Sequence, residues 1–108
     1  MEYIGDIIYD EKILDTRMQF IIYGAGKVGR RIYEYFKIND RQDSIRYFCD
    51  ANSALWGTKV KGVVVEGPDK LMEECGEYQF IFAGQYADEI CRFLLKKGIK
   101  NIHYVWIS

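Results

Sequence analysis

The sequence of 108 residues has little of what marks several classes of protein. It contains one proline and no low-complexity tract, and 49% of its residues are hydrophobic, which argues against disorder. The longest apolar runs, such as residues 20–23 and 62–65, are far too short to cross a bilayer, and the N-terminus lacks a signal pattern. We therefore expect one compact domain in the cytoplasm, without a membrane partner.

An excess of charge of one sign is also absent. Lys and Arg together number 15 against 16 Asp and Glu, so the formal net charge is −1. Non-specific binding to a phosphate backbone depends on a positive excess. The composition therefore predicts no nucleic-acid partner.

Residues that commonly carry catalysis or bind metals are few. The three cysteines, Cys49, Cys75 and Cys91, have no C-x-x-C spacing, which favours buried free thiols in a reducing compartment. The single histidine, His103, lies far along the chain from the glycine cluster described below. No serine stands in a G-x-S-x-G motif, and no cluster has metal-ligand spacing. We predict neither catalytic residues nor a metal site, so that the isolated chain binds a ligand without turning it over.

Apolar runs that predict strands alternate along the chain with segments of helical periodicity. Such alternation is typical of an open parallel sheet of about five strands, in the order 3-2-1-4-5, with helices on both faces. Residues 18–108 would form this domain, and residues 1–17 an N-terminal appendage that is either a short helix or a covering strand. The predicted strands are 19–23, 45–49, 62–65, 78–83 and 102–107, and the predicted helices run from 27 to about 39, from 68 to 76 and from 87 to 98.

The most informative motif is the G-x-G-x-x-G run from Gly24 to Gly29, between the first strand and the first helix. Gly24 suits the tight turn, Gly26 lets backbone N–H groups approach a pyrophosphate, and Gly29 lets the helix pack closely on the sheet. Together with the alternating elements, this motif predicts a three-layer, Rossmann-like α/β domain that binds a nucleotide. The alternative is a glycine turn that serves packing alone.

An acid ends the predicted second strand, since Asp50 lies 21 residues beyond Gly29. A carboxylate there can accept hydrogen bonds from a ribose diol and would repel a 2′-phosphate, so NADP is disfavoured as a ligand. The alternative role for Asp50 is to form the turn at the strand end, together with Asn52.

A second turn, Gly84-Gln85-Tyr86, follows the fourth strand, where strand order reverses and ligands of open α/β sheets usually bind. Tyr86 either stacks on a base or sugar or is structural. Trp56, in the loop after Asp50, would cover a ligand, fill a partner's surface or lie in the core. The predicted binding residues are Gly24, Ala25, Gly26, Lys27, Val28, Gly29, Asp50, Ala51, Asn52, Gly84, Gln85 and Tyr86.

From Met18 to about Gly98 the chain resembles the N-terminal Rossmann-like domain of bacterial hexapeptide-repeat sugar acyltransferases. The resemblance rests on I-I-Y-G-A-G-K-V-G, on F-C-D-A-N, on the hairpin-like spacing of Gly57, Gly62 and Val65, and on K-G-V-V-V ahead of G-P-D-K-L. It implies a nucleotide-sugar near Gly24, Gly26, Asp50, Asn52, Gly84 and Gln85. The catalytic β-helix of that family has no counterpart in these residues.

The predicted function is a non-catalytic nucleotide-binding domain in carbohydrate or cell-surface polysaccharide biosynthesis, whose ligand is a nucleotide-sugar or NAD. The alternative is the NAD-binding part of an oxidoreductase or epimerase whose substrate domain lies outside this chain. A third reading is an interaction module that keeps the fold but has lost the ligand. A homo-oligomer and a larger parent chain are both compatible with the sequence.

Overall fold

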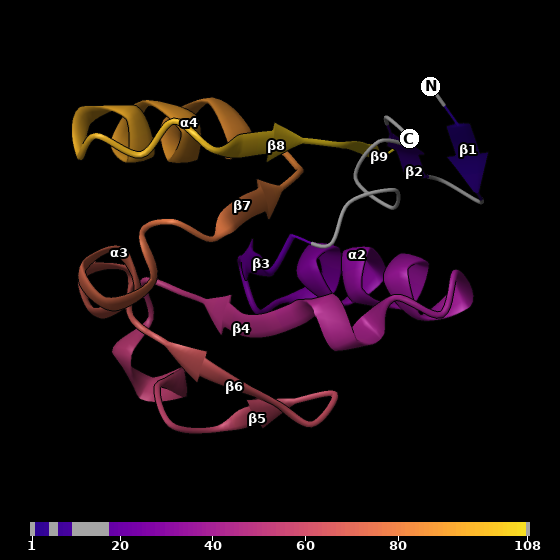
Figure 1. Ribbon diagram of the computed structural model, residues 1–108, viewed down its shortest axis with the longest axis horizontal. Helices are drawn as coiled ribbons and strands as arrows, with labels where there is room; N and C mark the ends of the chain where they lie inside the picture. The colour runs from indigo at the N-terminus through magenta and orange to yellow at the C-terminus, as the bar shows by residue number, and fades with distance from the viewer. Residues whose placement is uncertain (1, 5–6, 10–17, 108) are drawn as a thin grey trace.

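The computed structural model describes residues 2–4, 7–9 and 18–107. Within them the main sheet is built from β3 (Phe20–Tyr23), β4 (Ile45–Cys49), β5 (Lys59–Val60), β6 (Val63–Glu66), β7 (Gln79–Phe82) and β8 (Ile102–Tyr104). The strand order is β5-β6-β4-β3-β7-β8 (Figure 1). All pairs except β5–β6 are parallel, so the predicted order 3-2-1-4-5 is confirmed for the five parallel strands.

Helices cover both faces of this sheet, as predicted. They are α2 (Lys27–Ile38), α3 (Pro68–Cys75) and α4 (Ala87–Lys96), and short 3-10 turns lie at Gln42–Ser44 and Ser53–Leu55. Side chains of β3 alternate between the faces: Phe20 packs against Phe36 of α2, whereas Ile21 joins a cluster with Leu71 of α3 and Leu94 of α4. This alternation places one core on each side of the sheet. No helix of the described residues is long and apolar enough to cross a membrane.

The β5–β6 hairpin adds an antiparallel edge that the predicted strand pattern lacked. Lys61 and Gly62 form its turn with positive φ angles of 54° and 81°, as a two-residue hairpin turn requires. Lys61 also forms an ion pair with Glu34 of α2, with 2.8 Å between Nζ and Oε1. The resemblance had indicated a hairpin-like stretch in this region, and the hairpin lies there.

The predicted last strand, 102–107, is divided between two sheets. The amide of Val105 still donates to the carbonyl of Phe82 at 3.0 Å, and its buried side chain joins the core on the α2 side. After this residue the chain leaves the main sheet, and β9 (Trp106–Ile107) pairs with β2 (Ile7–Tyr9), which pairs with β1 (Glu2–Ile4). Residues 2–4 and 7–9 are therefore strands rather than a helix. The rest of the predicted appendage, 1–17, lies outside the described residues, and its boundary stays a prediction.

Candidate nucleotide-binding site

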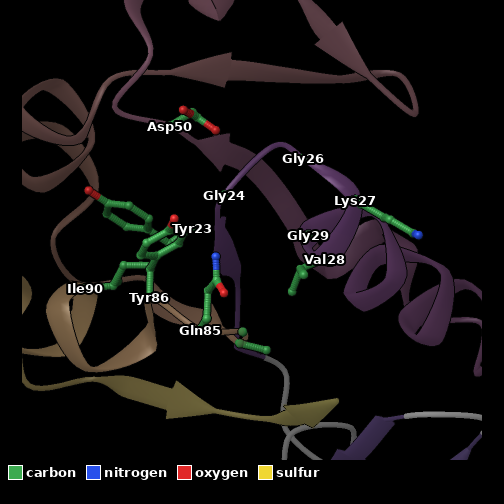
Figure 2. A pocket seen from close by; sticks show the side chains of 12 residues that line it. Tyr23, Gly24, Gly26, Lys27, Val28, Gly29, Asp50, Gln85, Tyr86 and Ile90 are labelled. Carbon is green, nitrogen blue, oxygen red and sulfur yellow. The ribbon is translucent and has the colours of Figure 1, made fainter. Parts of the chain in front are cut away.

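An open pocket of about 590 Å³ lies at the carboxyl ends of β3, β4 and β7, next to the point where strand order reverses (Figure 2). Its size is in the range of small-molecule sites in proteins. The fold brings nine of the twelve predicted binding residues to its wall. These are Gly24, Gly26, Lys27, Val28, Gly29, Asp50, Gly84, Gln85 and Tyr86.

The pocket lining differs from the predicted set in six residues. Ala25, Ala51 and Asn52 do not line the pocket, and Ala25 is instead buried in the core beside α2. Sequence reasoning missed Tyr23, Ala83 and Ile90, which complete the wall. Ile90 lies one helical turn beyond Tyr86, so the i, i+4 spacing was the signal that could have found it.

Two of the three motif glycines are required by the fold itself. Gly24 has a φ of 112°, which residues other than glycine rarely adopt. A Cβ on Gly29 would lie 1.8 Å from the carbonyl oxygen of Gly24. Gly26 differs from both, because its φ of −88° is ordinary and no atom lies within 4 Å of a Cβ built there. Neither backbone conformation nor packing therefore explains why position 26 is glycine. The missing side chain leaves open space at the pocket wall.

The N-terminus of α2 faces this pocket without an acidic residue of its own helix. Gly26 is the N-cap and provides no side-chain cap, and the first turn contains no acidic residue. The free N–H groups and the helix dipole at such an end favour an anion. The side chain of Lys27 extends away from Asp50 and Tyr86 (Figure 2), so at this end the attraction comes from the backbone.

Asp50 is held in place by backbone donors on both sides. Its Oδ2 accepts a hydrogen bond from the amide of Ala25 at 2.9 Å, and its Oδ1 accepts one from the amide of Asn52 at 2.8 Å. The carboxylate thus ties the glycine turn to the end of β4. Because each carboxylate oxygen can accept a second bond, Asp50 also keeps acceptor capacity toward the pocket. The turn-forming and ligand-facing roles weighed for Asp50 are therefore compatible.

The groups beneath the glycine turn are neutral near pH 7. Burial, together with the nearby Asp50 carboxylate, raises the pKa of Cys49 far above its ordinary value. Burial likewise raises the pKa of Tyr23, with smaller contributions from Cys49 and Asp50. Tyr23 lines the pocket and meets Phe93 edge-on, with 6.5 Å between ring centroids. This side of the pocket therefore offers a neutral aromatic surface.

His103 does not line the pocket. It lies on β8, where its Nε2 is 2.8 Å from Oε1 of Gln79 and its ring packs edge-on against Phe20. Within the described part of the chain, no group of three or more His, Cys, Asp or Glu side chains is placed to hold a metal ion.

A glycine turn beneath a pocket at the switch point of a parallel sheet defines a Rossmann-like domain of the nucleotide-binding type. Comparison with known proteins narrows this class. No family model matches the chain. The redox-sensing transcriptional repressor Rex of Clostridium novyi is 28% identical over 95 residues, which are 82% of this chain and 45% of that protein. The chain thus spans about half the length of the curated relatives it matches.

Solved structures agree with this relationship. RSP, a Rex-family repressor, superposes with a TM-score of 0.66 at 26% identity, over 85% of this chain and 47% of that chain. RSP has also been crystallised with β-NADH, and with β-NAD⁺ and operator DNA, and these structures match with 26% and 27% identity and TM-scores of 0.60. They cover 86% and 84% of this chain and 48% and 45% of those chains. A UDP-D-quinovosamine 4-dehydrogenase from Vibrio fischeri, at 16% identity and a TM-score of 0.59 over 82% of this chain and 78% of that one, shares the fold alone.

These relatives overturn the predicted role in polysaccharide biosynthesis and the assignment to the sugar acyltransferases. The matched proteins are redox-sensing repressors, and a nucleotide-sugar ligand and the enzyme alternative gain no support. The physical reason for the error is that the glycine turn and the switch-point crevice serve any nucleotide, so they do not identify the group attached to it.

The prediction of no nucleic-acid partner is also wrong for proteins of this kind, because RSP binds operator DNA. Net charge tests only whether these 108 residues attract a phosphate backbone non-specifically. Net charge says nothing about the remaining half of each relative's sequence, which this chain does not cover.

Proposed function

We propose that this chain binds NAD(H) in the pocket above the glycine turn, as the redox-sensing part of a Rex-like transcriptional regulator in the cytoplasm. Support comes from the repressors that match more than four fifths of the chain. The observation that carries the proposal is Gly26, where a side chain is missing although nothing in the protein would contact it. A ligand phosphate that approaches the backbone gives a reason for this absence.

In the proposed complex, the pyrophosphate lies against the amides at the start of α2. Asp50 accepts hydrogen bonds from the ribose diol of the adenosine half, and it repels a 2′-phosphate, so NADP binds poorly. The other half of the dinucleotide extends toward Gln85 and Tyr86, which lie on the far side of the pocket from Lys27 (Figure 2). An open wall of this kind suits a ligand that spans two strand ends.

A redox sensor must bind the two forms of the cofactor with different affinity. A ligand shifts a conformational equilibrium only by its differential affinity for the two states, and NADH and NAD⁺ can send different signals only if they differ in this respect. Coupling free energies in such systems are typically about 1–3 kcal/mol, which corresponds to about 5- to 150-fold. We expect the affinities for NADH and NAD⁺ to differ within this range.

Isothermal titration calorimetry with NADH, NAD⁺ and NADPH tests this proposal. The wild-type chain should bind NADH and NAD⁺ with unequal affinity and bind NADPH more weakly than NADH. Gly26→Val should stay folded, with a loss of about 1 kcal/mol because valine is disfavoured at an N-cap, but it should lose binding, because its side chain points into the space that the phosphate needs. Ala54→Val, which places the same side chain at an exposed residue outside the pocket and keeps the backbone amide, should bind like wild type.

Three results would contradict the proposal at different points. Binding that survives Gly26→Val would place the ligand elsewhere. Equal affinity for NADH and NAD⁺ would argue against sensing, although not against dinucleotide binding. Equal affinity for NADH and NADPH would show that Asp50 does not discriminate against the 2′-phosphate.

The regulatory half of the proposal concerns DNA. A tagged copy, expressed from its own promoter, should cross-link to discrete genomic sites. The occupancy of these sites should change when the cellular ratio of NADH to NAD⁺ is shifted. A uniform background with no enriched site would reject regulation and leave cofactor binding standing.

A further inference from the structure

Trp56 lies between the 3-10 turn Ser53–Leu55 and β5, outside the pocket lining and 46% exposed. It therefore neither covers the pocket nor fills the core. Its indole Nε1–H donates a hydrogen bond to the backbone carbonyl of Asp50 at 2.7 Å. The side chain thus acts on the residue that faces the ribose in the proposed complex.

The Trp56 ring packs directly on Gly67. Gly67 is buried at the N-cap of α3, with an ordinary φ of −79°. A Cβ built there would lie 2.7 Å from the indole ring, and the three atoms nearest to it all belong to Trp56. Glycine at this position is therefore explained by the ring that packs on it. Trp56 is held at two points, by its ring on Gly67 and by its N–H on Asp50.

The segment between Asp50 and Trp56 forms a closed set of hydrogen bonds. The amide of Asn52 donates to Oδ1 of Asp50 at 2.8 Å, and Oδ1 of Asn52 in turn accepts from the amide of Ala54 at 3.1 Å. Trp56 closes the set at the far end by bonding back to Asp50. If the indole N–H is lost, the segment that presents the Asn52 amide is freed, and the carboxylate loses one of the two donors that orient it.

We propose that Trp56 is a positioning residue that sets the choice between NADH and NADPH by holding the Asp50 carboxylate in one orientation. This inference rests on the proposed function. A fixed carboxylate accepts from a ribose diol and repels a 2′-phosphate in the same place. A carboxylate free to rotate turns away from the phosphate and loses part of its bond to the diol, so the discrimination weakens from both sides.

The test measures the ratio of the affinities for NADH and NADPH. Trp56→Phe keeps an aromatic side chain at this position but removes the N–H, and it should lower this ratio about tenfold, as expected for one hydrogen bond. Gly67→Ala displaces the ring by a different change and should lower the ratio in the same direction. Thr58→Val is the control, because it removes another hydrogen bond of this region, from Oγ1 to the carbonyl of Leu55 at 2.6 Å, that does not involve Asp50.

A double-mutant cycle separates positioning from general stability. In the Asp50→Asn background, which already lacks the carboxylate charge, Trp56→Phe should leave the ratio unchanged. A purely structural role would instead weaken the binding of both cofactors equally in either background. A ratio that stays at the wild-type value in Trp56→Phe, or falls equally in Thr58→Val, overturns the inference.

These outcomes differ from a failure of the proposed function. If the wild-type chain binds no dinucleotide, or binds NADH and NADPH equally, the role of Asp50 fails, and the role of Trp56 fails with it. If the wild type discriminates and only the Trp56 variant behaves unexpectedly, the proposed function stands and the positioning role alone is rejected.

Discussion

Two of the turns that lead from a strand into a helix at the carboxyl edge of the sheet line the pocket, and they differ in charge. One joins β3 to α2 and begins at Gly24, with a φ of 112°, and the other joins β7 to α4 and contains Gly84, with a φ of 98°. The first turn of α2 carries no acid, whereas that of α4 carries Asp88 and Glu89. The dipole of α4 is therefore matched by carboxylates of its own helix, and that of α2 is not.

This difference divides one pocket into two chemical halves. The helix end beside Gly26, which has no acid in its own first turn, suits the phosphates of the proposed ligand. The turn into α4 instead presents Tyr86, a ring that is 60% exposed although it stands at an N-cap, where small polar residues are preferred. A residue that breaks a local rule at a pocket wall is often retained for function. The comparison teaches that similar backbone turns can serve unlike parts of one ligand.

The largest expected effect concerns Gly29, which packs against the first turn, and Gly84, which lies in the second. Gly29→Ala should lower the free energy of unfolding by about 3 kcal/mol or more, because its Cβ would overlap the Gly24 carbonyl oxygen at 1.8 Å. In Gly84→Ala the new Cβ lies at an ordinary 3.6 Å from Val28, so only the strain of positive φ remains. That strain costs about 1–2 kcal/mol. Urea unfolding measures both values, and equal losses would show that the turns are equally constrained.

The second prediction concerns alkaline pH and the residues beneath the first turn. Burial raises the pKa of Cys49 and Tyr23 in the folded state, so both stay protonated where the unfolded chain begins to ionise. The unfolded chain then binds fewer protons than the folded one, and stability falls as the pH rises above the ordinary thiol pKa of about 8.5. A fully protected thiol contributes a slope of about 1.4 kcal/mol per pH unit.

Unfolding free energies measured from pH 7 to 10 check this slope. Cys49→Ala should show a shallower fall than wild type, whatever its stability at pH 7. Val65→Ala, at a buried residue without an ionisable side chain, serves as the control and should keep the wild-type slope. Identical slopes in all three proteins would refute the assignment to Cys49.

The third prediction tests the ring at the turn into α4. Tyr86→Ala should weaken NADH binding about tenfold, in line with the loss of one stacking contact. The affinity for ADP-ribose, which lacks the nicotinamide, should stay at its wild-type value, because the adenosine and phosphate contacts lie on the other turn. Tyr86→Phe keeps the ring and should bind both ligands like wild type. Equal losses of affinity for NADH and ADP-ribose in Tyr86→Ala would contradict the division of the pocket into two chemically different halves.

The smallest effect is expected from two substitutions that reverse the charge of one side chain at the start of each helix. Lys27→Glu places an acid at the start of α2 and should stabilise the ligand-free protein by about 0.5 kcal/mol while weakening NADH binding. Glu89→Lys makes the opposite change in α4 and should destabilise the protein by a similar amount with no large effect on binding. Thermal unfolding with and without NADH measures both, and the difference should shrink at high salt. A matching change in binding for both variants would mean that the helix ends are equivalent.

Much of the framework of the site could be predicted from the sequence. The glycine spacing from Gly24 to Gly29 places a turn, a helix start and a close contact within six residues, and each follows from local backbone geometry. The order of the parallel strands followed from the alternation of strands and helices and from the rule that crossovers are right-handed. The choice among nucleotide ligands could not follow, because the turn contacts phosphates that all of these ligands share.

What the sequence by itself determined is the β3–α2–β4 unit with its glycine turn and terminal acid, because those features depend on neighbours close along the chain. Only the tertiary structure decided which residues complete the pocket and how Asp50 is held. The amide of Ala25 meets the Asp50 carboxylate across 25 positions, and Tyr23 and Ala83 reach one wall from the ends of different strands. The packing of Trp56 on Gly67 is of the same kind, since this contact forms only when the loop after β4 packs against the start of α3. Contacts of this kind leave no periodic signal, because they depend on how separate elements dock and not on the order of residues within one element.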